Sequence, residues 1–281
     1  MTMSIPRHPG RRRILQMGAL AAGAAAAHLP QFATAATPAL IRVGVTSGPH
    51  EQIFGVVKRV AERDFALKIK VVPFNDYVQP NAALAAGDLE ANSFQHRPFL
   101  AAAIRAQGYK LVGFGKTWVG PIGLYSKRYK SLAELPVGAQ IALPNDPANG
   151  GRVLLLLQQA GLVRLKTGID PVAGVFATKL DIVDNPRKLR LVEIDSPQLP
   201  RSLDDVDAAA INADYASKAG LKPGRDAILL EDKEGPYACL IAVREQDRAQ
   251  PWVQQLVQAY QTDEVRAFIV KEFDGVVIPA F

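Results

Sequence analysis

From residue 41 onward, short apolar runs rich in β-branched residues alternate with stretches in which apolar residues recur at helical spacing. The first run, IRVGVT at 41–46, precedes a stretch at 51–65 whose apolar positions 53, 56, 57, 60 and 61 share one helix face. Further strands are predicted at 68–74, 89–94 and 109–115, and further helices at 80–88 and 97–108. This alternation predicts a layered α/β fold with a largely parallel sheet.

The alternation restarts after residue 121. Strands are predicted at 122–126, 140–144, 189–194, 208–212 and 227–231, with a helix at 150–161. The last 36 residues are mostly helical, and Thr262 is a suitable N-cap for the second C-terminal helix. We therefore expect two α/β units that meet near residues 117–123. Because no low-complexity linker separates them, we expect the units to be joined by strands and to leave a cleft between them.

Three polar segments stand at the ends of predicted strands: FNDY at 74–77, FQHRPF at 94–99 and PNDPANGGR at 144–152. Clefts between α/β units, at the carboxyl ends of strands, are common ligand sites. In the third segment, free backbone N–H groups at a helix start would attract an anion, and Arg152 could bind a carboxylate through two hydrogen bonds. Gly150 and Gly151 would let the backbone approach it closely. A helix cap next to a surface arginine explains the same residues, so both readings stay open.

The other two segments are rich in aromatic residues. Their rings could form the wall of an apolar pocket or could belong to the core, and the core is expected for Phe74. Tyr77 follows the turn signal Asn75–Asp76, so we expect it to face the cleft. His96 lies between Phe94 and Phe99 and is either a buried core histidine or a corner of a ligand site.

Catalytic and metal-binding patterns are missing from the sequence. It contains neither G-x-S-x-G nor H-E-x-x-H, and only His50 and His96 lie beyond residue 36. Cys239 is the single cysteine, in the apolar run YACLIAV, and is expected to be a buried structural thiol. We therefore expect no catalytic residues, no metal and no cofactor.

The charge of the chain is concentrated at its start. The formal net charge is +6, but residues 1–36 hold four arginines and no acidic residue, so 29 basic residues face 27 acidic ones in the rest. A nucleic-acid partner is therefore not expected.

Residues 1–35 read as a secretory signal peptide, because a charged start precedes the uncharged run 14–27 and the small residues Ala33–Ala35. Arg11 and Arg12 followed by Ile14 and Leu15 fit a twin-arginine signal, and an ordinary export signal is the alternative. No cysteine follows the apolar run. We therefore expect a soluble periplasmic protein, exported by the twin-arginine route and not lipid-anchored.

Several strings in order resemble the NlpA/MetQ family of methionine-binding proteins, from about residue 41 to the C-terminus: FNDYVQPNAAL, FQHRPFL, PNDPANGGR, PQLPRSLDD and EDKEGPY. The resemblance implies a two-lobed periplasmic-binding-protein type II fold with a ligand cleft between the lobes, which serves an ABC importer. Lobe I would comprise residues 36–120 and 238–281, and lobe II residues 121–237. The implied partners are a small amino-acid ligand and a permease in the cytoplasmic membrane, and we expect a monomer.

The resemblance also implies a binding site. Arg152 would bind the carboxylate of the amino acid, and Asn149 and Asn212 would contact its polar backbone. The side-chain pocket would be lined by four further residues: Tyr77, Phe94, His96 and Phe99. His96 would act there as a hydrogen-bond donor.

Cys239 departs from the family pattern, which often has asparagine at this position after Pro-Tyr-x. The resemblance implies methionine or a closely related amino acid as the ligand. The thiol is a weaker hydrogen-bonding group than an amide, which is a reason to consider a ligand other than methionine itself. A short peptide or modified amino acid is the alternative, and a periplasmic enzyme is a third hypothesis. Alternation along the strand lets the Cys239 side chain face either the cleft or the core.

Overall fold

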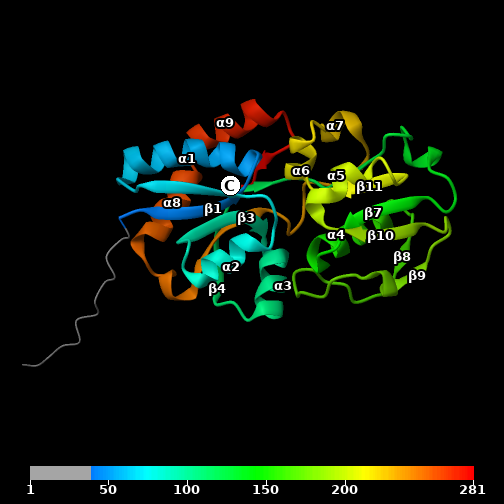
Figure 1. Ribbon diagram of the computed structural model, residues 1–281, viewed down its shortest axis with the longest axis horizontal. Coiled ribbons are helices and arrows are strands. Elements are labelled where there is room, and N and C mark those ends of the chain that lie inside the picture. Colours follow the sequence, from blue (N-terminus) through cyan, green and yellow to red (C-terminus); the bar gives the residue numbers. More distant parts are fainter. Residues whose placement is uncertain (1–38) are drawn as a thin grey trace, which may run out of the picture. The chain divides into compact units, whose positions relative to one another are not determined.

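The computed structural model of the protein describes residues 39–281, which form two five-stranded sheets with helices packed on both faces of each (Figure 1). Within this range, the helices are all too short or too polar to cross a membrane. The α/β class predicted from the alternation of strands and helices is confirmed.

The first sheet has the strand order β2-β1-β3-β13-β4. Its strands are β1 (Ile41–Thr46), β2 (Ile69–Phe74), β3 (Ala91–His96), β4 (Leu111–Lys116) and β13 (Cys239–Arg244). Its helices are α1 (Pro49–Phe65), α2 (Gln79–Ala86), α3 (Arg97–Gln107), α8 (Pro251–Tyr260) and α9 (Asp263–Phe273). Thr262 caps α9 as predicted, since its side chain accepts a hydrogen bond from the Val265 N–H.

Two apolar clusters cover the faces of this sheet. On one face, Val43 and Val45 of β1 pack with the buried residues of α1, α8 and α9, including Trp252. On the other face, Ala242 of β13 packs with Leu84 of α2 and Leu100 of α3. The three helices α1, α8 and α9 therefore lie together on the face opposite to α2 and α3 (Figure 1).

The second sheet has the strand order β10-β7-β11-β6-β12. Its strands are β6 (Gly123–Tyr125), β7 (Gln140–Pro144), β10 (Arg190–Ile194), β11 (Ala208–Ile211) and β12 (Ala227–Leu230). Its helices are α4 (Pro147–Gln159), α5 (Leu199–Ser202), α6 (Ala213–Lys218) and α7 (Pro223–Asp226). Ile141 and Leu143 of β7 pack on α4, while Ala142 between them packs on the other face with α5 and α6.

Both sheets are mixed, but four of the five strands in each run in the same direction, so the prediction of a largely parallel sheet is confirmed with one exception in each sheet. β13 is antiparallel to β3 and β4, between which it lies. β6 is likewise antiparallel to β11 and β12. In the first sheet, the reason is that β13 belongs to the part of the chain that returns from the second sheet, and it therefore enters in the opposite direction.

The chain passes between the sheets twice, along residues 117–122 and 231–238. The first passage contains β5 (Trp118–Val119), which pairs with the last strand of the chain, β14 (Ile278–Pro279). A second two-stranded ribbon joins β8 (Arg164–Leu165) to β9 (Ile182–Asp184). Single turns of 3₁₀-helix lie at Leu132–Glu134, Lys179–Asp181, Ser196–Gln198 and Glu245–Asp247.

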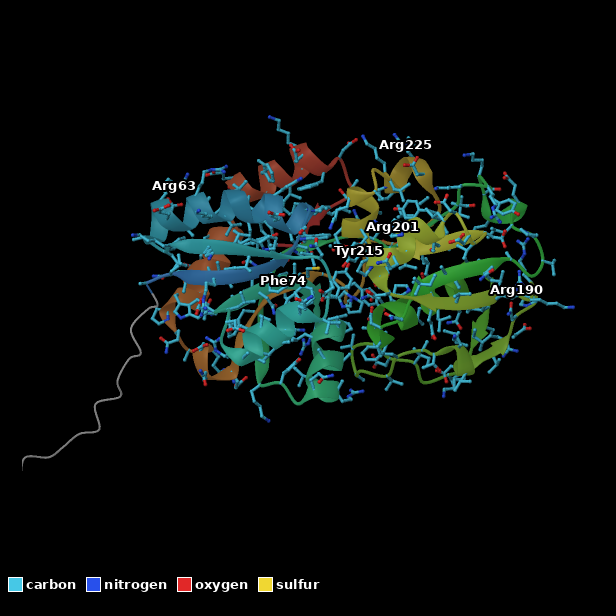
Figure 2. All side chains as sticks on the ribbon, in the orientation of Figure 1. Arg63, Phe74, Arg190, Arg201, Tyr215 and Arg225 are labelled. Carbon is cyan, nitrogen blue, oxygen red and sulfur yellow. The ribbon has the colours of Figure 1, made fainter. Side chains whose placement is uncertain are left out.

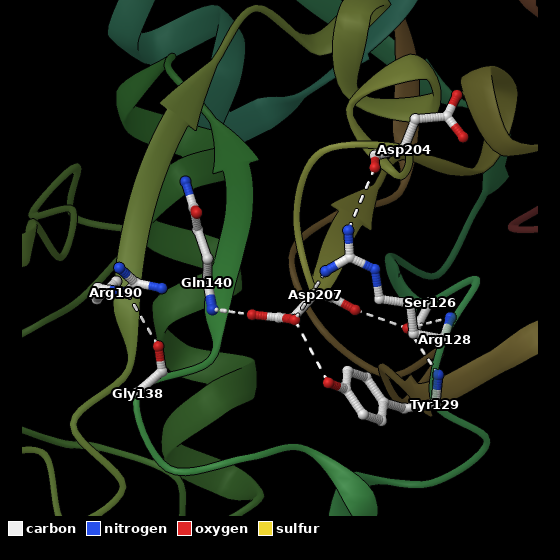
Figure 3. A network of polar contacts seen from close by, with 8 residues as sticks. All are labelled: Ser126, Arg128, Tyr129, Gly138, Gln140, Arg190, Asp204 and Asp207. Atoms are coloured by element: carbon white, nitrogen blue, oxygen red, sulfur yellow. Dashed lines mark hydrogen bonds and ion pairs between the residues drawn. The ribbon is translucent and has the colours of Figure 1, made fainter.

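Asp207 links several segments by hydrogen bonds at the end of the second sheet where β7 and β11 begin (Figure 3). Its carboxylate accepts hydrogen bonds from the Gln140 N–H at 2.8 Å and from Arg128 Nη1 at 3.2 Å. Its backbone carbonyl accepts from the Ser126 hydroxyl at 2.6 Å. The residue therefore joins the starts of β7 and β11 to the loop that follows β6.

Asp207→Ala should lower the free energy of unfolding by about 1–3 kcal/mol, because the Gln140 N–H and the Arg128 guanidinium lose their acceptor. Asp204→Ala is the matched control, since the Asp204 side chain is 68% exposed and forms a surface ion pair with Lys127. That control should change stability by less than about 0.5 kcal/mol. Urea denaturation measures both variants, and equal losses would show that Asp207 has no special role.

Candidate functional site

A cavity lies where residues of the two sheets meet, and it is lined from both of them. All eight residues predicted from the sequence line it: Tyr77, Phe94, His96, Phe99, Asn149, Arg152, Asn212 and Cys239. Near the cavity, the Tyr215 hydroxyl donates to the Asn75 carbonyl at 3.2 Å, in the region between the sheets where Figure 2 labels Tyr215.

Arg152 projects from α4 and is 4% exposed. Its Nε donates to Glu231 Oε1 at 2.7 Å, and its Nη2 donates to the Gly120 carbonyl at 2.9 Å and to the second oxygen of Glu231. Its guanidinium carbon lies 4.2 Å from the centre of the Tyr237 ring. Two of the three nitrogens are thus held by the chain itself, while no hydrogen bond among residues 39–281 uses Nη1. The pair of hydrogen bonds that was predicted for a ligand carboxylate is formed with Glu231 instead, and Nη1 remains available to a ligand.

Of the two readings of the start of α4, the structure supports the helix cap rather than free N–H groups for an anion. The helix begins at Pro147, three residues earlier than predicted, and Asp146 is its N-cap. The Asp146 side chain accepts from the Asn149 N–H at 2.8 Å, and the Gly150 N–H donates to the Asp146 carbonyl at 2.8 Å. The chain therefore places its own carboxylate where a bound anion was expected.

The glycine pair has a packing role. A Cβ on Gly150 would lie 2.7 Å from the Pro144 carbonyl oxygen, and one on Gly151 would lie 3.0 Å from the Ala177 nitrogen. The first distance is a steric clash, and the second is a contact so tight that the neighbouring backbone would have to shift. Gly150 and Gly151 therefore let α4 pack closely on the end of β7 and on the segment around Ala177.

His96 ends β3 and is also the N-cap of α3. Its Nδ1 accepts the Phe99 N–H at 3.2 Å, so the ring proton belongs on Nε2, which lies 3.1 Å from Asn149 Oδ1. Burial, together with the charge of Arg152, lowers the pKa of His96 to about 3. His96 is therefore a neutral donor to Asn149, and the chain occupies both of its ring nitrogens.

The two asparagines continue this chain of hydrogen bonds into the second sheet. Asn149 Oδ1 also accepts from Asn212 Nδ2 at 3.1 Å, and Asn149 Nδ2 donates to Asp146 at 2.9 Å. The Oδ1 atom of Asn212 is buried and has no hydrogen-bond partner within the described part of the chain. Asn212 thus offers one acceptor, fixed in place by Asn149, to a ligand in the cavity.

The aromatic residues form one compact wall. Tyr77 lies 6.0 Å from Phe94 and 5.9 Å from Phe99 between ring centres, and Phe94 and Phe99 are also 5.9 Å apart. These rings line the cavity, which decides between the two alternatives left open by the sequence. Phe74 packs instead against the apolar cluster around Leu84, as expected for a core residue.

Cys239 begins β13, is paired in register with His96, and lines the cavity. Its Sγ lies 3.8 Å from the Phe94 carbonyl oxygen. Burial raises the pKa of the Cys239 thiol to about 12, so the group stays protonated and is a poor nucleophile. The Cys239 side chain therefore faces the cavity, which is one of the two orientations that the strand alternation allowed.

Seven further residues line the cavity and were not predicted as site residues: His50, Gln95, Trp118, Gly120, Ala213, Asp214 and Tyr237. Glu231, the partner of Arg152, was also missed, although it does not line the cavity itself. Trp118 Nε1 donates to His50 Nδ1 at 3.1 Å, which joins the first passage between the sheets to α1. The signal for Asp214 was available, because it closely follows the predicted strand 208–212. Within residues 39–281, no group of three His, Cys, Asp or Glu side chains is arranged to hold a metal ion.

The mixed sheets, the two passages of the chain and the cavity lined from both sides define a two-lobed periplasmic-binding-protein fold of type II. A methionine-bound nutrient-binding protein from Burkholderia cenocepacia has a TM-score of 0.83 and 54% identity, over 86% of this chain and all of that chain. A family model described as NlpA lipoprotein matches residues 41–281, and the chain belongs to this family.

Curated relatives agree with this assignment. The D-methionine-binding lipoprotein MetQ of Salmonella typhimurium is 51% identical over 240 residues, which covers 85% of this chain and 87% of the relative. Outer membrane lipoprotein 3 of Mannheimia haemolytica is 47% identical over 238 residues, 85% of this chain and 89% of the relative. The expectation of a binding protein rather than an enzyme agrees with relatives named for binding methionine.

The same comparisons correct the predicted localisation. The family and the relatives are described as lipoproteins, which contradicts a soluble, twin-arginine-exported protein without a lipid anchor. The weakness of that prediction was that it relied on a cysteine missing after the run 14–27 rather than on any group present. The signal-peptide prediction for residues 1–35 lies outside the described residues.

His96→Asn should make the free energy of unfolding less dependent on pH. Unfolded histidine binds a proton below about pH 6.5, whereas folded His96 does so only near pH 3, so the wild type loses stability as pH falls through this window. The wild-type curve should be steeper by about 1.4 kcal/mol per pH unit between pH 6 and 4. Asparagine keeps an N-cap acceptor. Urea titrations at several pH values test this, with a constant offset expected above pH 7.5, and parallel curves below pH 6 would contradict it.

Proposed function

We propose that this protein is the solute-binding protein of an ABC importer and that it binds methionine or a closely related amino acid in the cavity. One observation carries the proposal: a buried arginine with one uncommitted nitrogen and a compact wall of aromatic rings line the same cavity. Such a site suits a small molecule with a carboxylate at one end and an apolar side chain at the other. The methionine-bound structure of 54% identity supports this choice.

Each part of the ligand has a candidate partner in the proposed complex. Arg152 Nη1 binds the carboxylate, and Asn212 Oδ1 accepts from the amino group. Tyr77, Phe94 and Phe99 contact the side chain, where a thioether gains from contact with aromatic rings. His96 and Asn149 hold Asn212 in place rather than binding the ligand through their own hydrogen bonds.

The proposed lobes are residues 36–120 with 238–281, and residues 121–237. They would move about the two passages of the chain and close on the ligand. The described state has contacts across the cavity, such as His96 to Asn149 and Tyr77 to Asp214. We further propose that the protein acts as a monomer that delivers its ligand to a permease in the cytoplasmic membrane. The near balance of charge beyond residue 36 does not suit binding to nucleic acid.

A modified amino acid is the second candidate ligand. Cys239 supports it, because its thiol forms part of the cavity wall and is a weak hydrogen-bonding group. A ligand with an apolar substituent near Cys239 would contact the thiol without losing a hydrogen bond.

Arg152→Lys should weaken L-methionine binding at least about tenfold, or 1.4 kcal/mol. A single ammonium group cannot reproduce the fork that binds Glu231 while another nitrogen binds the ligand. Arg225→Lys is the matched control, because Arg225 is an exposed arginine that pairs with its neighbour Asp226. Calorimetry should show unchanged affinity for the control, and tight binding by Arg152→Lys would remove Arg152 from the site.

Cys239→Asn should strengthen L-methionine binding by about tenfold. An amide both donates and accepts, so it can add about one good hydrogen bond to a charged amino-acid backbone, roughly 1–3 kcal/mol. Cys239→Ala is the control, because it removes the thiol without adding a hydrogen-bonding group. If Cys239→Asn has unchanged affinity and lower thermal stability, the ligand backbone does not reach this position.

A further inference from the structure

Asp214 is a buried carboxylate that lacks a cationic partner among residues 39–281. It lies in the first turn of α6, is 4% exposed and lines the cavity. The positive charge of Arg152, which lines the same cavity, is already matched by Glu231. The wall of the cavity therefore retains one uncompensated acidic group.

The groups that do contact Asp214 are neutral donors. Oδ1 accepts from the Tyr77 hydroxyl at 2.6 Å and from the Tyr215 N–H at 3.0 Å. Oδ2 accepts from the Thr46 hydroxyl alone, at 3.2 Å. Because each carboxylate oxygen can accept two hydrogen bonds, Oδ2 keeps capacity for one more donor.

Burial of this group is costly while it stays ionised. Desolvation raises the pKa of Asp214, and the three neutral donors offset only part of the cost. A cation next to the carboxylate would remove the remaining penalty, because a buried charge is stabilised when it is paired and hydrogen-bonded. The described residues offer no such cation, so a ligand that enters the cavity is the available source.

A second acceptor lies two residues away. Asn212 Oδ1 is buried without a partner, and Asn212 and Asp214 line the same cavity. A primary ammonium group has three donors, so it can satisfy both acceptors at once. A neutral amide, hydroxyl or thioether would satisfy the hydrogen bonds but would leave the negative charge of Asp214 uncompensated.

We propose that Asp214 binds the α-ammonium group of the ligand and selects ligands that carry this charge. This inference rests on the proposed amino-acid-binding function and assigns the recognition of the amino group to a particular residue. It also links recognition to closure of the cleft. Thr46 and Tyr77 reach Asp214 from the first sheet, so one carboxylate binds both the ligand and the opposite lobe.

The test uses L-methionine and 4-(methylthio)butanoate, which keeps the carboxylate and the side chain but lacks the amino group. Calorimetry on the wild type should show at least about 30-fold tighter binding of L-methionine. Asp214→Asn, which keeps the shape and removes the charge, should weaken L-methionine binding at least tenfold and leave the analogue unchanged or improved. The ratio of the two affinities should therefore fall at least tenfold.

Tyr215→Phe is the matched control. It removes a hydroxyl that joins the lobes through the Asn75 carbonyl and that does not bond to the Asp214 carboxylate, so it should shift both affinities by a similar factor and keep their ratio. If Asp214→Asn also weakens both ligands equally, Asp214 only joins the lobes and the proposal is overturned.

The wild type alone provides a test if Asp214→Asn does not fold. Equal wild-type affinities for L-methionine and the analogue would show that the ammonium group contributes nothing to binding. That result overturns the proposal without any variant. A wild type that binds L-methionine while the ratio survives Asp214→Asn refutes this inference alone. A wild type that binds neither compound refutes the proposed function and this inference with it.

Discussion

The buried ion pair between Arg152 and Glu231 determines what the cavity can bind. Two nitrogens of the guanidinium are committed to the carboxylate and to the Gly120 carbonyl, and the ring of Tyr237 lies against it. This fixes the direction of the third nitrogen before any ligand arrives, so little side-chain entropy remains to be lost on binding. The charges of Arg152 and Glu231 also cancel each other. The remaining acidic residue in the cavity wall, Asp214, then favours a positively charged group in the ligand.

A second property of the site is that its polar groups hold one another rather than pointing freely into the cavity. His96, Asn149 and Asn212 form a continuous run of hydrogen bonds from β3 to the end of β11. Because each member uses most of its hydrogen-bonding capacity within the chain, few atoms stay open, and those few have fixed positions. Rigid, sparse polar groups within an aromatic wall are what a specific small-molecule site requires.

Local sequence patterns predicted most of the strands and helices, and they placed three polar segments at strand ends. The eight site residues were implied by the family resemblance, and all of them line the cavity. What the local patterns missed depends on distant parts of the chain. The direction of β13 depends on the return from the second sheet, and the partner of Arg152 lies 79 residues further along. The helix α4 starts three residues earlier than predicted, because Asp146 is its N-cap and Pro147 its first residue, while the glycine pair lies within its first turns. Asp214 follows its strand as closely as Tyr77 does, yet its charge state depends on burial that no sequence pattern displays.

The position of β13 in the first sheet also has a consequence for the order in which the chain can fold during synthesis. The five strands of the second sheet, β6, β7, β10, β11 and β12, are complete once residue 230 has emerged from the ribosome. In the sequence, β1 of the first sheet begins more than eighty residues before β6 of the second. Strand β13, which lies between β3 and β4 in the first sheet, is nevertheless translated only with residues 239–244. Until then β3 and β4 each present an unpaired edge, which is the kind of surface that pairs with other chains. The half that is translated first is therefore the half that is completed last, and its exposed edges need protection for as long as translation of the other half takes.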